Sequence, residues 1–297
     1  MKYVITGSLG HISKPVVTAL VKAGKEVVVI TSNTDRVKEI ESLGATAAVG
    51  SVEDVPFLTA AFRGALVVYT MVPPTYEVTD WKAHIGQIGK NYATAIKANN
   101  IKYVVNLSSI GAHMKDGCGP VSGLYNAEHA LNELEGVNIR HLRPAYFYYN
   151  LYNNIGLIKN MGIIGSNFGI AGKKFPIVEP ADIAEVVIEQ LLNLSFKGHK
   201  VQYIASDEVS TDDIATEIGK SIGKPDLKWV TFTDEQALQG AIQAGLPKEL
   251  ASNYTEMGHA INTGEMSSDY WKHHPATLQK TKLADFAKSF AAAFNAN

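Results

Sequence analysis

Residues 2–13 read K-Y-V-I-T-G-S-L-G-H-I-S, and this stretch decides the fold that the rest of the chain builds on. Residues 4–5 belong to a short apolar, β-branched run, which is typical of a strand buried on both faces. Gly7 and Gly10 follow at once, and from Ile12 onward apolar residues recur with a helical period. A strand, a glycine turn and a helix in this order predict an anion site, because the helix N-terminus offers free N–H groups.

The glycine spacing is G-x-x-G-x-x-S rather than the G-x-G-x-x-G of ordinary dinucleotide-binding proteins. Two glycines are also found where a strand simply turns into a capped helix, and the spacing alone leaves that alternative open. The strand before the turn and the helix after it favour cofactor binding. Ser13 stands where the last glycine usually lies, and it is small enough to keep helix and strand close.

The composition indicates a globular protein without an electrostatic affinity for polyanions. The chain has 297 residues, of which 46% are hydrophobic and 19% are charged, and its net charge is −2. This charge gives no reason to expect nucleic acid or an anionic membrane as a partner. The length allows a large α/β unit with a smaller appendage.

Cysteine usage and hydropathy favour a reduced compartment, and we expect a cytoplasmic protein that is a monomer or a homodimer. The single cysteine, Cys118, cannot form a disulfide within the chain, and an inert thiol is the expected state. No run approaches the ~18 apolar residues of a membrane span. His273 and His274 lack the further ligands that a metal site needs, so no metal is expected.

Strands and helices alternate along the first half of the chain, which predicts repeated βαβ units. After the first strand, strands are predicted at residues 26–31, 45–50, 65–71, 103–108 and 138–143. The clearest helix repeats apolar residues at Trp81, Ile85, Ile88, Tyr92 and Ile96. The fold class is therefore α/β, a doubly wound parallel sheet with a smaller, mainly helical C-terminal region.

We expect residues 1–150 to form the nucleotide-binding domain, with its sheet completed by later segments to about residue 205. Residues 151–297 are expected to form a substrate-binding region. There the pattern predicts a glycine-rich loop at 162–172, a helix at 180–194 with Asp182 near its first turn, and a strand at 200–205. Further helices are predicted at 211–222, capped by Ser210 or Thr211, and at 235–244, 248–261 and 276–294.

In a doubly wound sheet the ligand lies beyond the carboxyl ends of the strands. The second strand is followed by no acidic residue that would bond the ribose hydroxyls of NAD. Ser32 can donate to a phosphate and Arg36 can pair with one, which favours NADP, with NAD possible. Arg36 is also explained as a solvated helix charge, and Asp35 beside it weakens the case for NADP.

The candidate cofactor contacts follow the strand ends. They are Gly7, Leu9, Gly10, His11, Ile12, Ser32, Arg36, Ser51, Val52, Met71, Val72, Pro73, Ser108, Pro144, Tyr146 and Phe147. Ser51 is expected near the adenine and Ser108 near the nicotinamide. The four aromatic residues 146–149 either wall a pocket for a flat substrate or belong to the core, and the pattern favours neither.

Several stretches together resemble the NmrA-like group of atypical short-chain dehydrogenases/reductases. They are T-G-S-L-G-H-I (6–12), P-P (73–74), V-N-L-S-S-I-G (105–111), L-R-P-A-Y-F (142–147) with Asn150, P-A-D-I-A (180–184), P-A-T-L (275–278) and D-F-A (285–287). The resemblance implies a Rossmann-type domain for NADP(H), sometimes NAD(H), and a C-terminal substrate cleft. Members include quinone, azo-dye and phenylpropanoid reductases, and also sensors of the cofactor ratio without catalytic activity.

The resemblance also implies candidate catalytic groups. Related dehydrogenases use a Tyr with a Lys four residues on, which lowers the pKa of the phenol. Here His129 follows Tyr125 at that spacing, and Ser108 is the candidate oxyanion partner. The family's Phe-Met-Glu-Asn motif stands here as F-Y-Y-N (147–150), so its glutamate is missing.

Two functions follow from this sequence. The first is an NADPH-dependent reductase that passes a hydride to a small flat acceptor such as a quinone or a conjugated carbonyl compound. The alternative is a binding protein that holds NADP(H) without chemistry and senses its redox state. The aromatic cluster and the long C-terminal region favour the enzyme.

Overall fold

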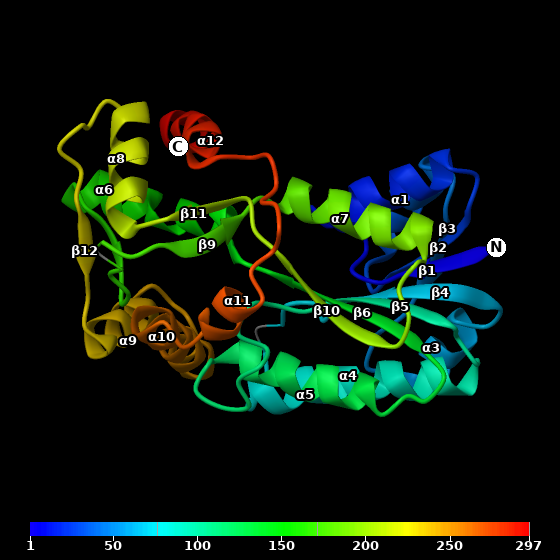
Figure 1. Cartoon of the computed structure of the whole chain (residues 1–297). Helices are drawn as coiled ribbons and strands as arrows, with labels where there is room; N and C mark the ends of the chain where they lie inside the picture. Colours follow the sequence, from blue (N-terminus) through cyan, green and yellow to red (C-terminus); the bar gives the residue numbers. More distant parts are fainter. Residues whose placement is uncertain (76, 171, 297) are drawn as a thin grey trace.

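A computed structural model describes residues 1–75, 77–170 and 172–296, and its core is a seven-stranded parallel sheet (Figure 1). The strand order is β10-β6-β5-β4-β1-β2-β3. The strands are β1 (Lys2–Ile5), β2 (Glu26–Thr31), β3 (Thr46–Val49), β4 (Ala65–Thr70), β5 (Tyr103–Leu107), β6 (Asn138–Pro144) and β10 (His199–Ile204). The predicted doubly wound parallel sheet is confirmed. Its order reverses between β1 and β4, and a crevice for ligands opens at such a switch point.

Helices cover both faces of this sheet, as Figure 1 shows. One face carries α1 (Ser13–Lys22), α2 (Val37–Ser42) and α7 (Pro180–Asn193). The other carries α3 (Val55–Ala61), α4 (Trp81–Ala98) and α5 (Pro120–Asn132). The central strands β1, β2, β4, β5 and β6 are mostly buried because both of their faces are covered, whereas the edge strands β3 and β10 are partly exposed. A 3₁₀ turn, η1 (Thr34–Arg36), precedes α2 and is capped by Asn33.

The C-terminal half contains short strands that the sequence did not predict. β7 (Tyr146–Phe147), β9 (Phe175–Val178) and β11 (Asp207–Val209) form one small sheet, and β8 (Ile164–Ser166) pairs with β12 (Trp229–Thr231) in another. β8 lies inside the stretch predicted as a loop, of which residue 171 is outside the described residues. The remaining elements are η2 (Tyr148–Asn154), α6 (Ile155–Met161), α8 (Thr211–Ser221), α9 (Asp234–Gln243) and α10 (Lys248–Thr263). Ser210 caps α8, as one of the two predicted alternatives.

The helix predicted at 276–294 is confirmed only from residue 283 onward, and residues 276–282 are not helical. The chain forms the short α11 (Ser268–Lys272) and then α12 (Leu283–Ala296), with an irregular strap between them. The strap is held by side chains and strands elsewhere: Gln279 N donates to Ala205 O over 2.8 Å, and Thr281 N donates to Asp182 Oδ2 over 3.1 Å. Tertiary hydrogen bonds therefore override the local helical pattern. Asp182 is fully buried and orders this strap, a role that its helix position did not reveal.

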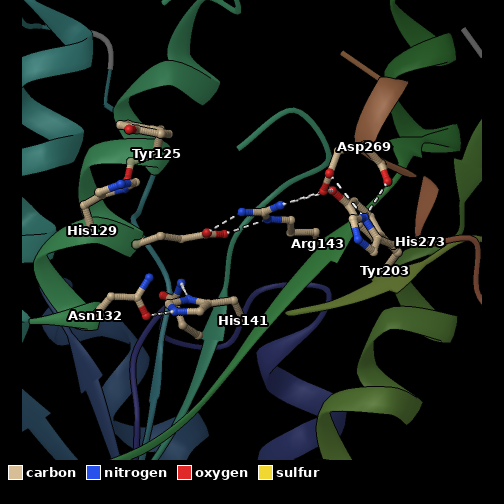
Figure 2. A network of polar contacts seen from close by, with 10 residues as sticks. Tyr125, His129, Asn132, His141, Arg143, Tyr203, Asp269 and His273 are labelled. Atoms are coloured by element: carbon tan, nitrogen blue, oxygen red, sulfur yellow. Dashed lines mark hydrogen bonds and ion pairs between the residues drawn. The ribbon is translucent and has the colours of Figure 1, made fainter. Parts of the chain in front are cut away.

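A buried charged cluster ties the C-terminal half to the main sheet (Figure 2). Arg143 at the end of β6 makes two bonds to Glu128 of α5, with its Nη2 2.6 Å from Glu128 Oε2 and its Nε 3.0 Å from Oε1. Its Nη1 also contacts Asp269 of α11 at 3.3 Å, and Tyr203 of β10 donates to the same carboxylate over 2.6 Å. Burial opposes the charge of Asp269, but this hydrogen bond and nearby positive charges hold its pKa below the usual value.

A second buried chain of polar groups crosses the sheet and contains a neutral histidine. Thr70 Oγ1 donates to Asn106 Oδ1 over 2.9 Å, and the Asn106 amide lies 3.1 Å from His141 Nδ1. The other ring nitrogen of His141 contacts Asn132 Oδ1 at 3.0 Å. These partners satisfy an imidazole that accepts at Nδ1 and donates at Nε2. Burial lowers the pKa of His141 to about 4.

Because His141 is buried in its neutral form, we expect the folded protein to lose stability as the pH falls. The unfolded chain binds the proton at the ordinary histidine pKa near 6.5, whereas the folded chain resists it down to about 4. The free energy of unfolding should fall by about 3 kcal/mol between these pH values because of His141. Urea unfolding at several pH values tests this in the wild type and in His141→Gln, with exposed His199→Gln as the control. Equal pH slopes in the wild type and His141→Gln would contradict the assignment.

Candidate active site

The glycine turn after β1 is shaped by a close approach to the end of β4. Gly7 has a φ of +86°, and a Cβ there would lie 2.8 Å from the Cγ and Sδ atoms of Met71. Ser8 N donates to Ile30 O over 3.1 Å, which brings the turn against the end of β2. Only glycine fits the first position without strain, because both its φ and the space exclude a side chain.

No side chain caps the N-terminus of α1 among the described residues, but the Lys14 N–H already donates to a main-chain oxygen of the turn and Pro15 has no N–H, so the free N–H groups here are those of Ile12 and Ser13. Ser13 Oγ instead donates to Thr6 O over 3.3 Å, beside the end of β1. Ser13 therefore fills the place of the usual glycine while keeping helix and strand in contact, as predicted from its size. The free N–H groups and the helix dipole can bind an anion there.

A cavity of about 290 Å³ opens beside the turn, at the carboxyl ends of the first four strands. Of the predicted cofactor contacts, Gly7, Ser32, Ser51, Val52, Met71 and Pro73 line it. Its other lining residues are not among the predicted cofactor contacts: Ser8, Ile30, Thr31, Gly50, Glu53, Pro74, Thr75 and His84. Most of these directly neighbour predicted residues, but His84 comes from α4, and only the folded chain brings it here.

The remaining predicted contacts, apart from Arg36 and Ser108, lie in the glycine turn, after β4, or at and after the end of β6. Leu9 and Ile12 are buried in the core, whereas Gly10 and His11 are exposed at the turn. Val72 is half-buried against α4 residues. Pro144 ends β6, and the half-buried Tyr146 and Phe147 form β7 directly after it. These positions stay predictions as cofactor contacts.

Arg36 is not a freely solvated charge. Its Nη1 lies 2.7 Å from Glu39 Oε2, and Lys14 Nζ lies 2.8 Å from Glu39 Oε1. The hydrogen bonds from Lys14 and Arg36 lower the pKa of Glu39. Two cations, one from α1 and one from η1, therefore share one carboxylate of α2.

Ser108 directly follows β5, and its hydroxyl is buried without a hydrogen-bond partner among the described residues. Its main-chain N–H donates to Leu142 O over 2.8 Å, and Ile110 N donates to Pro144 O over 2.8 Å, so the loop continues along β6. The Ser108 Oγ is buried and has no hydrogen-bond partner among the described residues. A buried hydroxyl without a partner is costly. Its position at the switch point fits a group that a ligand satisfies.

Tyr125 and His129 lie together on α5, with ring centroids 3.9 Å apart. His129 Nδ1 contacts the main-chain oxygen of Tyr125 at 2.9 Å, not its phenol. Figure 2 shows both rings apart from the Arg143 cluster, to which the same helix contributes Glu128. The inward-facing ionisable group of α5 is thus Glu128, and a catalytic role for Tyr125 and His129 stays a prediction.

The four aromatic residues 146–149 divide between core and surface. Tyr148 is fully buried and stacks on Phe286 of α12 at 4.9 Å. Tyr149 is 52% exposed, and its ring lies 5.4 Å from His11 of the glycine turn. One member of the group therefore belongs to the core, whereas Tyr149 places an exposed aromatic face beside the turn.

The described residues provide neither a reactive cysteine nor a cluster of metal ligands. Cys118 is buried, and desolvation raises the pKa of its thiol to about 12, which keeps it protonated and inert. No group of three or more His, Cys, Asp or Glu side chains among residues 1–75, 77–170 and 172–296 is placed to hold a metal ion. No described helix has the length and apolar character to cross a membrane.

The site fits a dinucleotide. The uncapped α1 N-terminus can take a pyrophosphate, the cavity past β2 and β3 can take an adenosine, and the Ser108 hydroxyl lacks a partner at the nicotinamide end. These features define the class of a doubly wound nucleotide-binding protein. The chain belongs to the NmrA-like family, whose sequence pattern matches residues 2–287.

Named relatives extend over nearly the whole chain. An NAD(P)H azoreductase of Xenophilus azovorans is 24% identical over 296 residues, covering 98% of this chain and 99% of that protein. The triphenylmethane reductase of Citrobacter sp. complexed with NADP(H) superposes with a TM-score of 0.80 at 18% identity, over 97% of this chain and 99% of its own. An NADPH-dependent quinone oxidoreductase of Escherichia coli complexed with NADPH gives 0.75 at 17% identity, over 97% and 99%.

Gly7→Ala should abolish tight nucleotide binding, because the new Cβ meets Met71 and the positive φ disfavours it. We expect the Kd for NADPH to rise at least roughly ten-fold, about 1.4 kcal/mol. Gly64→Ala is the matched control, since Gly64 also has a positive φ of +76° but nothing within 4 Å of the place that a methyl group would occupy. Fluorescence titration measures both. An unchanged Kd for Gly7→Ala would contradict the prediction that the glycine turn binds the nucleotide.

Ser108→Ala should separate ligand binding from stability. Removing a buried hydroxyl without a partner should leave the melting temperature of the free protein unchanged or higher. The same change should weaken NADPH binding or lower kcat several-fold. Ser122→Ala is the control, because the Ser122 hydroxyl accepts a 3.2 Å bond from Cys118 N and its loss should destabilise the protein. A lower melting temperature for Ser108→Ala without a change in binding would contradict this role.

Proposed function

We propose that the protein is an NADPH-dependent oxidoreductase that transfers a hydride to a small flat acceptor of the quinone or conjugated-carbonyl type. The observation that carries the proposal is the joint geometry of the switch point. An uncapped helix N-terminus, a cavity of about 290 Å³ and a partnerless serine hydroxyl follow the ends of β1 to β5. This supports an extended nucleotide that begins at β3 and ends near β5 and β6.

The residues have distinct roles in this proposal. The N–H groups at the start of α1 bind the diphosphate, and Ser32 with Ser51 borders the adenosine. Ser108 donates a hydrogen bond at the nicotinamide end. The cofactor supplies the hydride, so the protein needs to orient the acceptor and exclude water more than to supply strong acid catalysis.

The acceptor site belongs to the C-terminal half. Residues 151–297, apart from α7 and the strand β10, which belong with the main sheet, form the proposed substrate region. It meets the switch point where α10 contacts α4: Trp81 N donates to Glu249 Oε1 over 3.0 Å, and Lys82 pairs with Glu256 at 2.6 Å. Trp81 and Tyr254 also lie with ring centroids 5.3 Å apart. Trp81 is buried, whereas Tyr254 and Tyr149 are exposed, and exposed aromatic faces favour a flat substrate.

The named relatives agree with this chemistry. One is named for azo compounds, one for triphenylmethane dyes and one for quinones, and each name includes NADP(H), NAD(P)H or NADPH. All these acceptor classes contain conjugated or aromatic ring systems. We extend this acceptor class to the present protein as part of the proposal.

Binding without turnover would favour the sensor instead, and one structural observation supports keeping that alternative. The phenol of Tyr125 has no hydrogen bond from His129, so the proton-donating pair of related dehydrogenases is incomplete. A sensor must bind the oxidised and reduced cofactor with different affinities.

The deciding experiment adds a panel of small quinones and azo compounds to purified protein with NADPH, and follows absorbance at the reduced nicotinamide band. We expect acceptor-dependent oxidation that the Gly7→Ala variant loses. Cofactor binding without oxidation by any acceptor would overturn the reductase. A difference between the Kd values of NADPH and NADP would then support the sensor.

A further inference from the structure

Three charged side chains from three different elements meet at the end of β2. Lys14 comes from the first turn of α1, Arg36 from η1 and Glu39 from α2. Both cations contact the same carboxylate, Lys14 at 2.8 Å and Arg36 at 2.7 Å. One oxygen of Glu39 faces each cation, so both oxygens are occupied. We call these residues the charge triad.

Two members of the charge triad follow segments of the proposed nucleotide site closely in the chain. Ser8 N–H bonds Ile30 O, and Ser8 Oγ donates to Thr31 Oγ1 over 3.0 Å, which fixes the glycine turn beside β2. Lys14 follows the turn and Arg36 follows β2, although neither side chain lines the cavity itself. Ser32 of the same loop lines the cavity. In doubly wound folds the loop after the second strand meets the ribose 2′ position.

Lys14 and Arg36 contact the Glu39 carboxylate much as two cationic side chains would contact a phosphate group. A carboxylate and a phosphate accept the same hydrogen bonds from Arg and Lys, with oxygens that spread toward two donors. The charge triad is open to water, with the Lys14, Arg36 and Glu39 side chains 51%, 49% and 33% exposed. Exposed ion pairs are individually weak, so an incoming dianion can replace the carboxylate.

We propose that Glu39 is an internal substitute for the 2′-phosphate and sets the preference between NADPH and NADH. With NADH bound, Lys14 and Arg36 keep Glu39 as their partner, so no cation is left uncompensated. With NADPH bound, the 2′-phosphate takes over both cations and Glu39 turns into solvent. The carboxylate therefore competes with the phosphate and narrows the difference in affinity between the two cofactors. This inference rests on the proposed cofactor binding.

The test compares Glu39→Gln with Glu41→Gln, which removes the same charge from an exposed position on the same helix. Kd values for NADPH and NADH are measured by fluorescence titration. In Glu39→Gln we expect NADPH to bind about ten-fold more tightly, with NADH changed less than about two-fold. Glu41→Gln should leave the ratio of the two Kd values unchanged. The melting temperatures of both variants should match that of the wild type, since the pairs are exposed.

Adenosine 2′,5′-bisphosphate and AMP isolate the 2′-phosphate from the nicotinamide. The gain in Glu39→Gln should appear with the bisphosphate and not with AMP, and it should shrink at high salt. Arg36→Ala should lower the affinity for the bisphosphate at least several-fold and leave AMP unaffected.

The outcomes separate the two proposals. A wild-type protein that binds neither NADPH nor NADH would overturn the proposed function itself. The role of Glu39 alone would be overturned if the protein binds both NADPH and NADH and the ratio of the two Kd values is the same in the wild type, in Glu39→Gln and in Glu41→Gln. Loss of NADH affinity in Glu39→Gln with unchanged NADPH affinity would also overturn it, because Glu39 would then bind the ribose hydroxyls directly.

Discussion

The contact between the loops after β1 and β4 is the constraint on which the site depends. Met71 N donates to Thr6 Oγ1 over 2.9 Å, and the Met71 side chain fills the space where Gly7 lacks a Cβ. Tyr92 of α4 donates to Met71 O over 2.7 Å and holds this loop from the other side. The two neighbouring strand ends are thereby locked together at the point where strand order reverses. The start of α1 then lies beside the crevice, with the N–H groups of Ile12 and Ser13 free to bind an anion.

Buried polar groups position the rest of the molecule around this crevice. The Arg143 cluster joins β6, α5, β10 and α11, and its removal from water is offset by bidentate contact with Glu128. Buried ion pairs add little net stability, but a broken one is costly, so such a cluster favours one placement of α11 over others. The neutral His141 chain lies on the same strand, two residues before Arg143. Charged and neutral groups thus share β6 without competing for partners.

The sequence was sufficient where local pattern and burial agree. The alternation of predicted strands and helices along the chain indicated the parallel sheet. The positions just after the strands included six residues that line the cavity. It was insufficient where distant contacts decide. The strap before α12 is extended because Asp182 and Ala205 hold it, although its own residues favour a helix. Likewise, no local signal shows that Arg36 shares Glu39 with Lys14, or that His84 reaches the cavity.

The central claim is that the turn after β1 cradles the diphosphate of a nicotinamide nucleotide. A crystal structure of the protein grown with NADPH tests it most directly. The account predicts the diphosphate oxygens within hydrogen-bond distance of the main-chain N–H groups at the start of α1, and the nicotinamide beside Ser108. A diphosphate bound elsewhere, or a nucleotide whose nicotinamide lies away from β5 and β6, would contradict it.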